Sequence, residues 1–395
     1  MKTLLFFCSM LLICSACTDE RQDIDIPEPG NHPAINAEHP MADSLQVLID
    51  RHIAAGIPGA LVAVRNADGL WIGAGGLARI ETREPMRTDM DFLIYSQSKT
   101  YFGALALRLQ EKGLLQLDRL AADYLPGAIV GELPGMDAIT VRMLLNHTSG
   151  IPNFSDILSY QTEVWMNGTR TRSREAILKH VYGHPLNFVP GSEYRYSNTN
   201  YLLLTFVIEG ATGQDHAEVL KEELLDPLNL EQTYYTGARD YPEGIALPNY
   251  YLDRFGDGRL ENYSRAEIAT EGYSSRGEGG LAASPEDVLK FLTLLADGEV
   301  LTSVSWQEMT HWVTGPGSVE PDYGLGLVYW NIGGGPAEFG HNGGGVAGFT
   351  SMFYFPGNRT AVFIAMNVGQ FSGGAYVGKT AGFRNQVLEF IARQN

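Results

Sequence analysis

A serine and a lysine three residues apart are the pair in this 395-residue chain whose types and spacing best suit chemistry. Ser96 and Lys99 stand at the head of an apolar run with helical spacing, so we expect them in the first turn of a helix and on one face of it. A hydroxyl beside an amine is what a serine nucleophile with a lysine base requires. The spacing is unique here, because none of the other six lysines has a serine three residues before it.

The structural alternative is that Ser96 only caps the helix. A capping serine is usually followed three residues later by Glu or Gln, whereas here Lys99 holds that position. A cation at the amino end of a helix is unfavourable by about 0.3–1 kcal/mol. Lys99 departs from the usual pattern of a helix start without any structural gain, which indicates a functional role. A motif this short nevertheless leaves both the catalytic and the capping interpretation open.

Other polar groups are weaker candidates. His147 and Ser149 precede Gly and Pro residues, a pattern typical of side chains that bond to a loop backbone. Tyr196 and Asn198 flank one residue, so in an extended loop their side chains point to the same side. The same Tyr-x-Asn spacing recurs at Tyr329, but there the alternation predicts a half-buried strand, so we prefer the first copy.

The amino-terminal segment is typical of an export signal over residues 1–16, with Lys2, an apolar run and two small residues. The apolar run is too short for a permanent membrane span. Small residues followed by Cys17 resemble a bacterial lipoprotein processing site, where Cys17 would carry the lipid. We therefore expect an exported periplasmic or cell-surface lipoprotein anchored to a bacterial membrane; the alternative is secretion. Residues 17–40, rich in Asp, Glu and Pro, are expected to form a flexible acidic tether.

Composition excludes several classes of function. The three cysteines all lie within the first 17 residues, so the rest of the chain has no thiol for a disulfide or a thiolate metal site. The net charge of −18 argues against nucleic acid as a partner. The glycine runs at 333–335 and 343–345 match no phosphate-binding fingerprint, and Gly-x-Ser-x-Gly and His-Glu-x-x-His are absent. We predict no metal, no cofactor and a monomer.

The hydrophobic pattern predicts elements of both kinds. Strands are expected at 60–65, 70–77, 325–331, 337–340, 349–355 and 360–367, and helices at 41–55, after Ser96, at 199–209, after a Ser284 cap and at 380–393. Strands at both ends with a helical middle predict an α/β fold of the α+β type. Its antiparallel sheet is built from the N- and C-terminal segments and flanked by helices, with a mainly helical inserted lobe, in one domain over residues 41–395.

Three motifs in order make the chain resemble the serine penicillin-recognising hydrolases, most closely the class C β-lactamase branch with its D-Ala-D-Ala carboxypeptidases and esterases. The motifs are Ser96-Gln97-Ser98-Lys99, Tyr196-Ser197-Asn198 and His341-Asn342-Gly343. The flanking residues 144–152, 190–192 and 340–344 also resemble that branch. The resemblance covers nearly all of the chain after the tether, and it implies a β-lactamase/transpeptidase-like fold and a serine hydrolase.

The resemblance also implies roles. Ser96 would attack a carbonyl and form an acyl-enzyme, and Lys99 or Tyr196 would move the proton. Asn198 would orient Lys99 and the substrate, with Asn342 and Gly343 also in the substrate site. The backbone N–H groups of Ser96 and Gly344 would form the oxyanion hole.

His341 departs from the pattern of classical β-lactamases, which carry lysine at this place. A histidine is only partly charged near neutrality, so it is a weaker anchor for a substrate carboxylate. We therefore expect a peptide, amide or ester hydrolase of the D-peptidase or esterase kind rather than an efficient β-lactamase. The alternatives are a class C-type β-lactamase and a non-hydrolytic penicillin- or peptidoglycan-binding sensor.

Overall fold

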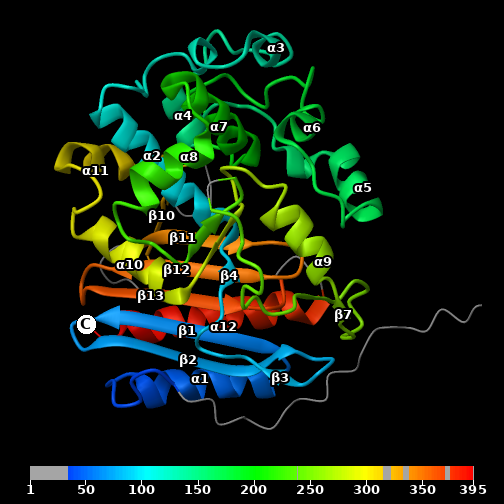
Figure 1. Ribbon diagram of the computed structural model, residues 1–395, viewed down its shortest axis with the longest axis vertical. Helices are drawn as coiled ribbons and strands as arrows, with labels where there is room; N and C mark the ends of the chain where they lie inside the picture. Colours follow the sequence, from blue (N-terminus) through cyan, green and yellow to red (C-terminus); the bar gives the residue numbers. More distant parts are fainter. Residues whose placement is uncertain (1–33, 238, 315–321, 332–337, 370–373, 395) are drawn as a thin grey trace, which may run out of the picture.

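An antiparallel sheet drawn from both ends of the chain crosses the molecule (Figure 1). The computed structural model describes residues 34–394 except 238, 315–321, 332–337 and 370–373. Within these residues the sheet has eight strands. In spatial order they are β3 (Glu84–Pro85), β2 (Gly69–Arg79), β1 (Gly59–Asn66), β13 (Thr360–Met366), β12 (Phe349–Phe355), β11 (Glu338–Gly344), β10 (Val328–Trp330) and β9 (Asp322–Tyr323).

The central strands are apolar along their whole length because both faces of the sheet are covered. In β1, Leu61 and Ala63 point into one core, while Ala60, Val62 and Val64 point into the other. This alternation follows from the two-residue period of a strand. The neighbouring strand β13 divides its residues between the two cores in the same way.

Helices from the two ends of the chain cover one face of this sheet. There α1 (Ala42–Ala54) packs on β2, and α12 (Gly374–Ala392) packs on α1, β12 and β13. On the other face, α10 (Pro285–Ala296) packs on β1, β12 and β13. A four-residue spacing buries one stripe of α1, formed by Leu45, Ile49 and Ile53.

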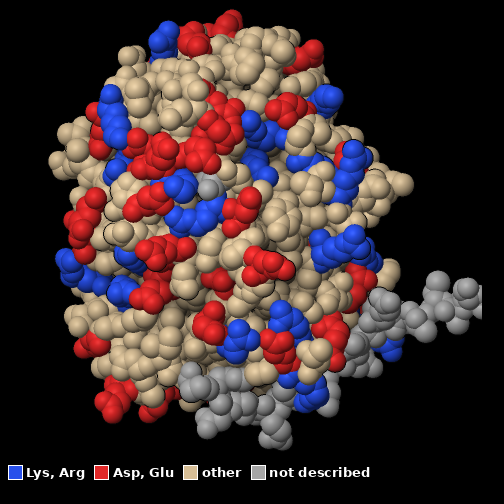
Figure 2. All heavy atoms as spheres, viewed as in Figure 1, with Lys and Arg blue, Asp and Glu red and all other residues tan. Residues whose placement is uncertain are grey.

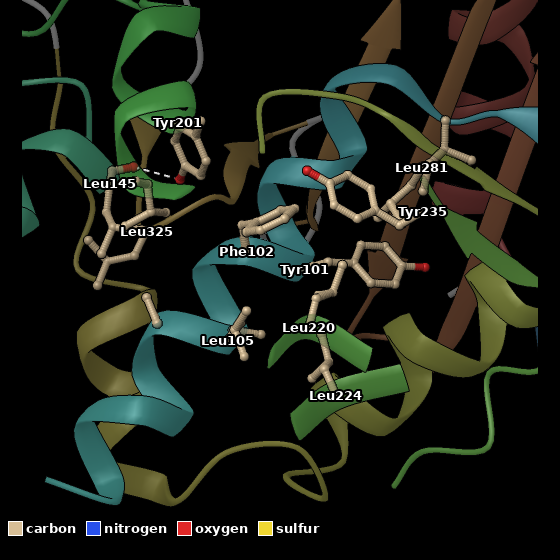
Figure 3. Packing of buried hydrophobic residues seen from close by; sticks show 14 of the residues in the cluster. Tyr101, Phe102, Leu105, Leu145, Tyr201, Leu220, Leu224, Tyr235, Leu281 and Leu325 are labelled. Atoms are coloured by element: carbon tan, nitrogen blue, oxygen red, sulfur yellow. Dashed lines mark hydrogen bonds between the residues drawn. The ribbon is translucent and has the colours of Figure 1, made fainter. Parts of the chain in front are cut away.

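The helix α2 (Ser98–Glu111) runs through the larger core (Figure 3) and is buried on almost all sides. Its Tyr101 ring stacks on Phe291 of α10 at 3.8 Å between centroids. A Cβ atom on Gly103 would lie 2.2 Å from the carbonyl oxygen of Leu325, so glycine there lets the chain cross α2 closely. This rigid helix carries Lys99.

The remaining elements form the helical lobe and its borders. The helices are α3 (Gly127–Val130), α4 (Val141–Leu145), α5 (Leu158–Met166), α6 (Arg174–Leu178), α7 (Asn198–Thr212), α8 (His216–Leu220), α9 (Ser264–Glu267) and α11 (Ser303–Met309). One-turn 3-10 helices are η1 (Tyr95–Gln97), η2 (Ala121–Asp123) and η3 (Phe154–Asp156), and π-helical turns are η4 (Lys221–Leu225) and η5 (Ile268–Gly272). Short strands pair as β4 (Phe92–Leu93), β8 (Leu281–Ala283) and β5 (Thr233–Tyr235), and as β6 (Tyr251–Leu252) with β7 (Glu261–Asn262).

The structure confirms the predicted fold class, a sheet from both termini around a helical insertion. Among the differences, β10 covers only Val328–Trp330 of the strand predicted at 325–331, β11 continues through residues 341–344, and α12 begins at Gly374 rather than residue 380. The end of the predicted tether lies on the domain, because Ile35 bridges to Ile72. The predicted signal, Cys17 and the glycine run at 333–335 lie outside the described residues.

The surface and the helices bear on possible partners. In the view of Figure 2, acidic and basic side chains are interspersed over the face of the molecule. In the part of the chain that the structure describes, none of the helices combines the length and the apolar character that crossing a bilayer requires.

Candidate active site

Ser96 lies in η1, the single turn between β4 and α2, rather than in the first turn of α2 as predicted. Ser96 is partly exposed, whereas Gln97 and Ser98 are buried. Neither η1 nor α2 has a side-chain hydrogen bond at its N-cap, so Ser96 is not a helix cap. The preceding residue, Tyr95, has φ of 49°, a left-handed conformation that is unfavourable for a bulky side chain.

Lys99 lies beneath Ser96 and is fully buried. Its Nζ is 3.0 Å from Ser96 Oγ, 2.8 Å from Asn198 Oδ1 and 2.8 Å from the backbone oxygen of Glu278. The last two oxygens can only accept hydrogen bonds. When the amine is neutral, they take its N–H groups and leave the nitrogen lone pair directed at the Ser96 hydroxyl.

The charge of Lys99 is set by its surroundings. Burial lowers the pKa of Lys99 to about 7, while the Glu278 and Glu271 carboxyls act in the opposite direction. Burial likewise raises the pKa of each of these two carboxyls to about 7. A neutral lysine amine is therefore accessible near neutral pH, although free lysine is a cation there.

Tyr196 comes from the loop before α7, and its ring centroid is 4.9 Å from Lys99 Nζ. Burial raises the pKa of the Tyr196 phenol, and the nearby Ser96 hydroxyl lowers it by less. Within the described residues the phenol oxygen has no hydrogen bond of good geometry. Asn198 is the first residue of α7, and its backbone N–H donates to Asn153 Oδ1 at 3.0 Å, which fixes the helix start beside Lys99.

His147 packs against Tyr196 and bonds to the backbone beside it. Its ring packs on Tyr196 at 4.4 Å between centroids, and its Nδ1 accepts from the Ser197 N–H and from Asn200 Nδ2. Burial, with smaller contributions from Lys99 and His341, lowers the pKa of His147, so the ring is neutral. These contacts confirm the loop-bonding interpretation of His147, but its packing against Tyr196 was not predicted.

His341 lies on β11 and is almost fully buried. Its Nδ1 is 2.5 Å from the backbone oxygen of Asn342, so Nδ1 carries the proton, and its Nε2 accepts from the hydroxyl of Tyr323 at 3.0 Å. Burial, followed by the charge of Lys99, lowers the pKa of His341 to about 3. The ring therefore provides no cation near neutrality. Its centroid is 6.3 Å from that of Tyr196.

The edge of β11 faces the Ser96 turn. Strand β10 pairs only with residues 338–340, which leaves His341 to Gly344 beside η1. A Cβ atom on Gly343 would lie 2.4 Å from the Ile94 oxygen, so a side chain there would push the strand away from the nucleophile. The Asn342 Oδ1 accepts from Ser351 Oγ on β12 at 2.8 Å.

One group of side chains in the described residues has ligand atoms close enough for a metal: Glu209, Asp215 and His216. Arg174 already pairs with Glu209 at 2.9 Å and lies 3.4 Å from His216 Nδ1. A guanidinium in this position repels a metal ion, so we interpret the group as a structural ion pair.

The structure thus brings together Ser96, Lys99, Tyr196 and Asn198, and sets His341 and the Gly343–Gly344 edge beside them. Sequence reasoning missed Glu271 and Glu278, which act against burial on the pKa of Lys99, and Tyr323, whose hydroxyl bonds to Nε2 of His341. Glu278 follows Arg276-Gly277 in a polar loop, and nothing in that pattern points to Lys99.

Comparison with known proteins identifies the family and the fold. The β-lactamase family model matches residues 41–381. Penicillin-binding protein 4* of Bacillus subtilis (strain 168) is 25% identical over 320 residues, which cover 78% of this chain and 67% of that protein. A D-stereospecific amidohydrolase from a Streptomyces species is 26% identical with a TM-score of 0.72, covering 82% of this chain and 94% of that structure.

The fold is also that of the D-amino acid amidase from Ochrobactrum anthropi SV3, solved with L-phenylalanine amide. That structure has a TM-score of 0.77 and 24% identity, over 90% of this chain and 99% of the amidase. The sequence resemblance drawn from three motifs is confirmed over most of the chain. The chain belongs to the β-lactamase family of serine hydrolases.

Proposed function

We propose that the protein hydrolyses amide bonds through an acyl-enzyme on Ser96. The observation that carries the proposal is the contact of 3.0 Å between Ser96 Oγ and Lys99 Nζ, made by a buried lysine whose pKa is about 7. A neutral amine at this distance can take the hydroxyl proton as the oxygen attacks the substrate carbonyl.

The other residues complete the reaction. Asn198 and the Glu278 backbone hold the lysine amine in position. The tetrahedral oxyanion is bound by the backbone N–H groups of Ser96 and Gly344. Tyr196 relays the proton to the leaving nitrogen, and the same groups activate water for deacylation. Since Lys99 contacts Ser96 Oγ with good geometry and the Tyr196 phenol does not, Lys99 is the base for acylation.

The substrate we infer is an amide of an amino acid or short peptide, of D configuration, that needs no carboxylate anchor. The neutral His341 offers no charge to a substrate carboxylate, and the carboxyls of Glu271 and Glu278 lie near Lys99. Penicillins and carboxypeptidase substrates carry such a carboxylate. The likeness to a D-stereospecific amidohydrolase and to a D-amino acid amidase supports the same class.

A fluorophosphonate probe and a substrate panel test the proposal. The probe should label the wild type and leave Ser96→Ala unlabelled, with the adduct mapped to Ser96 by mass spectrometry. The panel contains D- and L-amino acid amides, D-Ala-D-Ala peptides, p-nitrophenyl esters and cephalosporins, and turnover should be fastest with D-amino acid amides. Equal labelling of the two proteins would remove Ser96 as nucleophile. Stable acylation without turnover would instead support a sensor, and rapid cephalosporin hydrolysis a β-lactamase.

We also propose that the enzyme is exported and anchored to a bacterial membrane through lipid on Cys17. The sequence pattern of residues 1–17 supports this proposal. Palmitate labelling and membrane fractionation of the full chain test it: Cys17→Ser should lose both the label and the membrane fraction. Retention of the label by Cys17→Ser would contradict it.

A further inference from the structure

Tyr95 occupies a position where glycine would be the easier residue. Its φ of 49° lies in the left-handed region, and its side chain is 1% exposed. A large ring is thus held at strained backbone immediately before Ser96. Strain at such a place persists only where the surroundings impose it, and strained residues cluster at active sites and ligand clamps.

The ring lies against the turn that follows β11. A Cβ atom on Gly345 would be 2.5 Å from Tyr95 Cε1, and one on Gly348 would be 1.8 Å from Tyr95 Oη. A Cβ atom on Gly343 would be 3.0 Å from Tyr95 Cβ. None of these three glycines has a positive φ, so they are needed for space rather than for backbone freedom. The segment is shaped around the Tyr95 ring.

The turn and the ring are held from the other side as well. The Gly345 N–H donates to the Gly348 oxygen at 3.0 Å, which closes the turn. The buried Glu267 carboxyl lies so close that a Cβ atom on Gly345 would be 2.0 Å from its Oε1. It also faces the Tyr95 hydroxyl, without the geometry of a full hydrogen bond. The Tyr250 ring packs edge-on against Tyr95 at 6.5 Å.

These contacts connect the two halves of the oxyanion hole. Tyr95 is bonded to Ser96, and the residues on either side of Gly344 both lie against Tyr95. The two backbone N–H groups come from segments about 250 residues apart, and a donor must lie within about 2.7–3.1 Å of the oxyanion to act. We propose that Tyr95 is a positioning residue whose ring sets the spacing between the Ser96 and Gly344 N–H groups; this inference rests on the proposed acyl-enzyme function.

The test alters both partners of the contact between the Tyr95 ring and Gly348. Tyr95→Gly removes the ring and relieves the backbone, and Gly348→Ala keeps the ring but drives it out of place. Each should lower kcat by about 10²–10³, the loss seen when one oxyanion donor is removed, and leave KM nearly unchanged. Affinity for a boronic acid inhibitor, whose tetrahedral adduct occupies the same hole, should fall by the same factor.

A double-mutant cycle adds a rescue. Tyr95→Phe alone should be close to wild type, because the ring remains. Combined with Gly348→Ala it should recover part of the lost kcat, since the closest atom of the clash is the hydroxyl oxygen. The control is Phe383→Ala, which removes a buried ring from α12 on the opposite face of the sheet. It should lower Tm without changing the ratio of boronate affinity to substrate affinity.

The outcomes separate the two proposals. If Tyr95→Gly and Gly348→Ala lower Tm as Phe383→Ala does but keep kcat and boronate affinity, Tyr95 is only a core residue and the inference is wrong. If Tyr95→Gly does not fold, the cycle of Gly348→Ala with Tyr95→Phe decides by the presence or absence of rescue. Turnover retained by Ser96→Ala would instead overturn the proposed function.

Discussion

At the scale of single residues, the charge of Lys99 decides when Ser96 can react. A lysine in water keeps its proton until well above neutral pH. Here burial removes the solvation that favours the cation, and two carboxyls partly restore it. The reactive form is the neutral amine, so activity must rise as pH rises through the pKa of Lys99.

This gives a prediction for the pH profile. The value of kcat/KM should climb with an apparent pKa near 7 and then level off, because deprotonation of the lysine creates the base. Glu278→Gln removes a carboxyl that raises the pKa of Lys99, so the acidic limb should move to lower pH by a fraction of a unit. Steady-state rates across pH 5–9 measure both effects, with exposed Glu286→Gln on α10 as control. A limb that stays in place in Glu278→Gln would contradict this account of the Lys99 charge.

A second prediction separates the two Tyr-x-Asn copies. Tyr196→Phe keeps the ring packed on His147 and Lys99 but removes the proton relay, so kcat should fall by about 10²–10⁴ with little change in Tm. The matched control, Tyr329→Phe, alters the same spacing on strand β10 and should leave kcat unchanged. Single-turnover rates with a D-amino acid amide, whose leaving amine needs the proton, measure the acylation step. Equal rates for the two variants would remove Tyr196 from the mechanism.

At the scale of elements, close backbone approach fixes how helices present the site residues. Helix α7 carries Asn198 at its start, and near its end Gly210 lies under the chain at η2. A Cβ atom on Gly210 would be 1.9 Å from the Tyr124 oxygen. Alanine normally favours a helix over glycine, but here it has no room.

Two glycine substitutions test this packing. Gly210→Ala should destabilise the protein by about 1–3 kcal/mol, because backbone must move to admit the methyl group. Gly378→Ala in α12 meets nothing within 4 Å and should stabilise it by about 0.5–1 kcal/mol. Denaturant unfolding of both variants gives the two free energies. If both substitutions stabilise, the approach of α7 to Tyr124 is looser than described.

At the scale of the whole molecule, the two ends of the chain form one layer. Helices α1 and α12 pack on each other and bury the same face of the sheet. Phe383 of α12 is fully buried there and its ring lies 5.0 Å from that of His52 on α1. Helix α2, which carries Lys99, packs on the opposite face of the sheet, and the Ser96 turn η1 lies beside β11.

Substitutions in the layer formed by α1 and α12 should therefore change the stability of the protein without changing its catalytic rate. Phe383→Ala should lower the free energy of unfolding by about 3–5 kcal/mol through the cavity it leaves, with kcat unchanged below the unfolding range. Val377→Ala, at a residue of the same helix that is 40% exposed, should change stability by less than about 0.5 kcal/mol. Thermal unfolding and kcat at low temperature measure the two effects. A parallel loss of kcat in Phe383→Ala would show that this layer positions the active site.

Elements with a regular hydrophobic pattern could be predicted from the sequence. The helix expected at residues 41–55 is Ala42–Ala54, and the strand expected at 349–355 has the same limits in the structure. The extension of β11 over Gly343 and Gly344 was missed because glycine has a low strand propensity. Pairing with β12 and the lack of room beside Ile94 impose the strand there.

The sequence by itself determined which groups are available and how closely they follow one another along the chain. A nucleophile and an amine three residues apart, in order with a tyrosine, an asparagine and a histidine motif, were sufficient for the family and its reaction class. The order of the three motifs carries the resemblance to the family, and local spacing fixes only which side chains lie near one another.

Only the tertiary structure decided the chemical state of those groups. Lys99 meets acceptors 99 and 179 residues away, which orient its lone pair, and burial brings its pKa to about 7. The neutral state of His341 follows from its burial, and the ring of the strained Tyr95 finds room against glycines some 250 positions later. Burial and long-range contacts set protonation and strain, and neither can be read from neighbours in the chain.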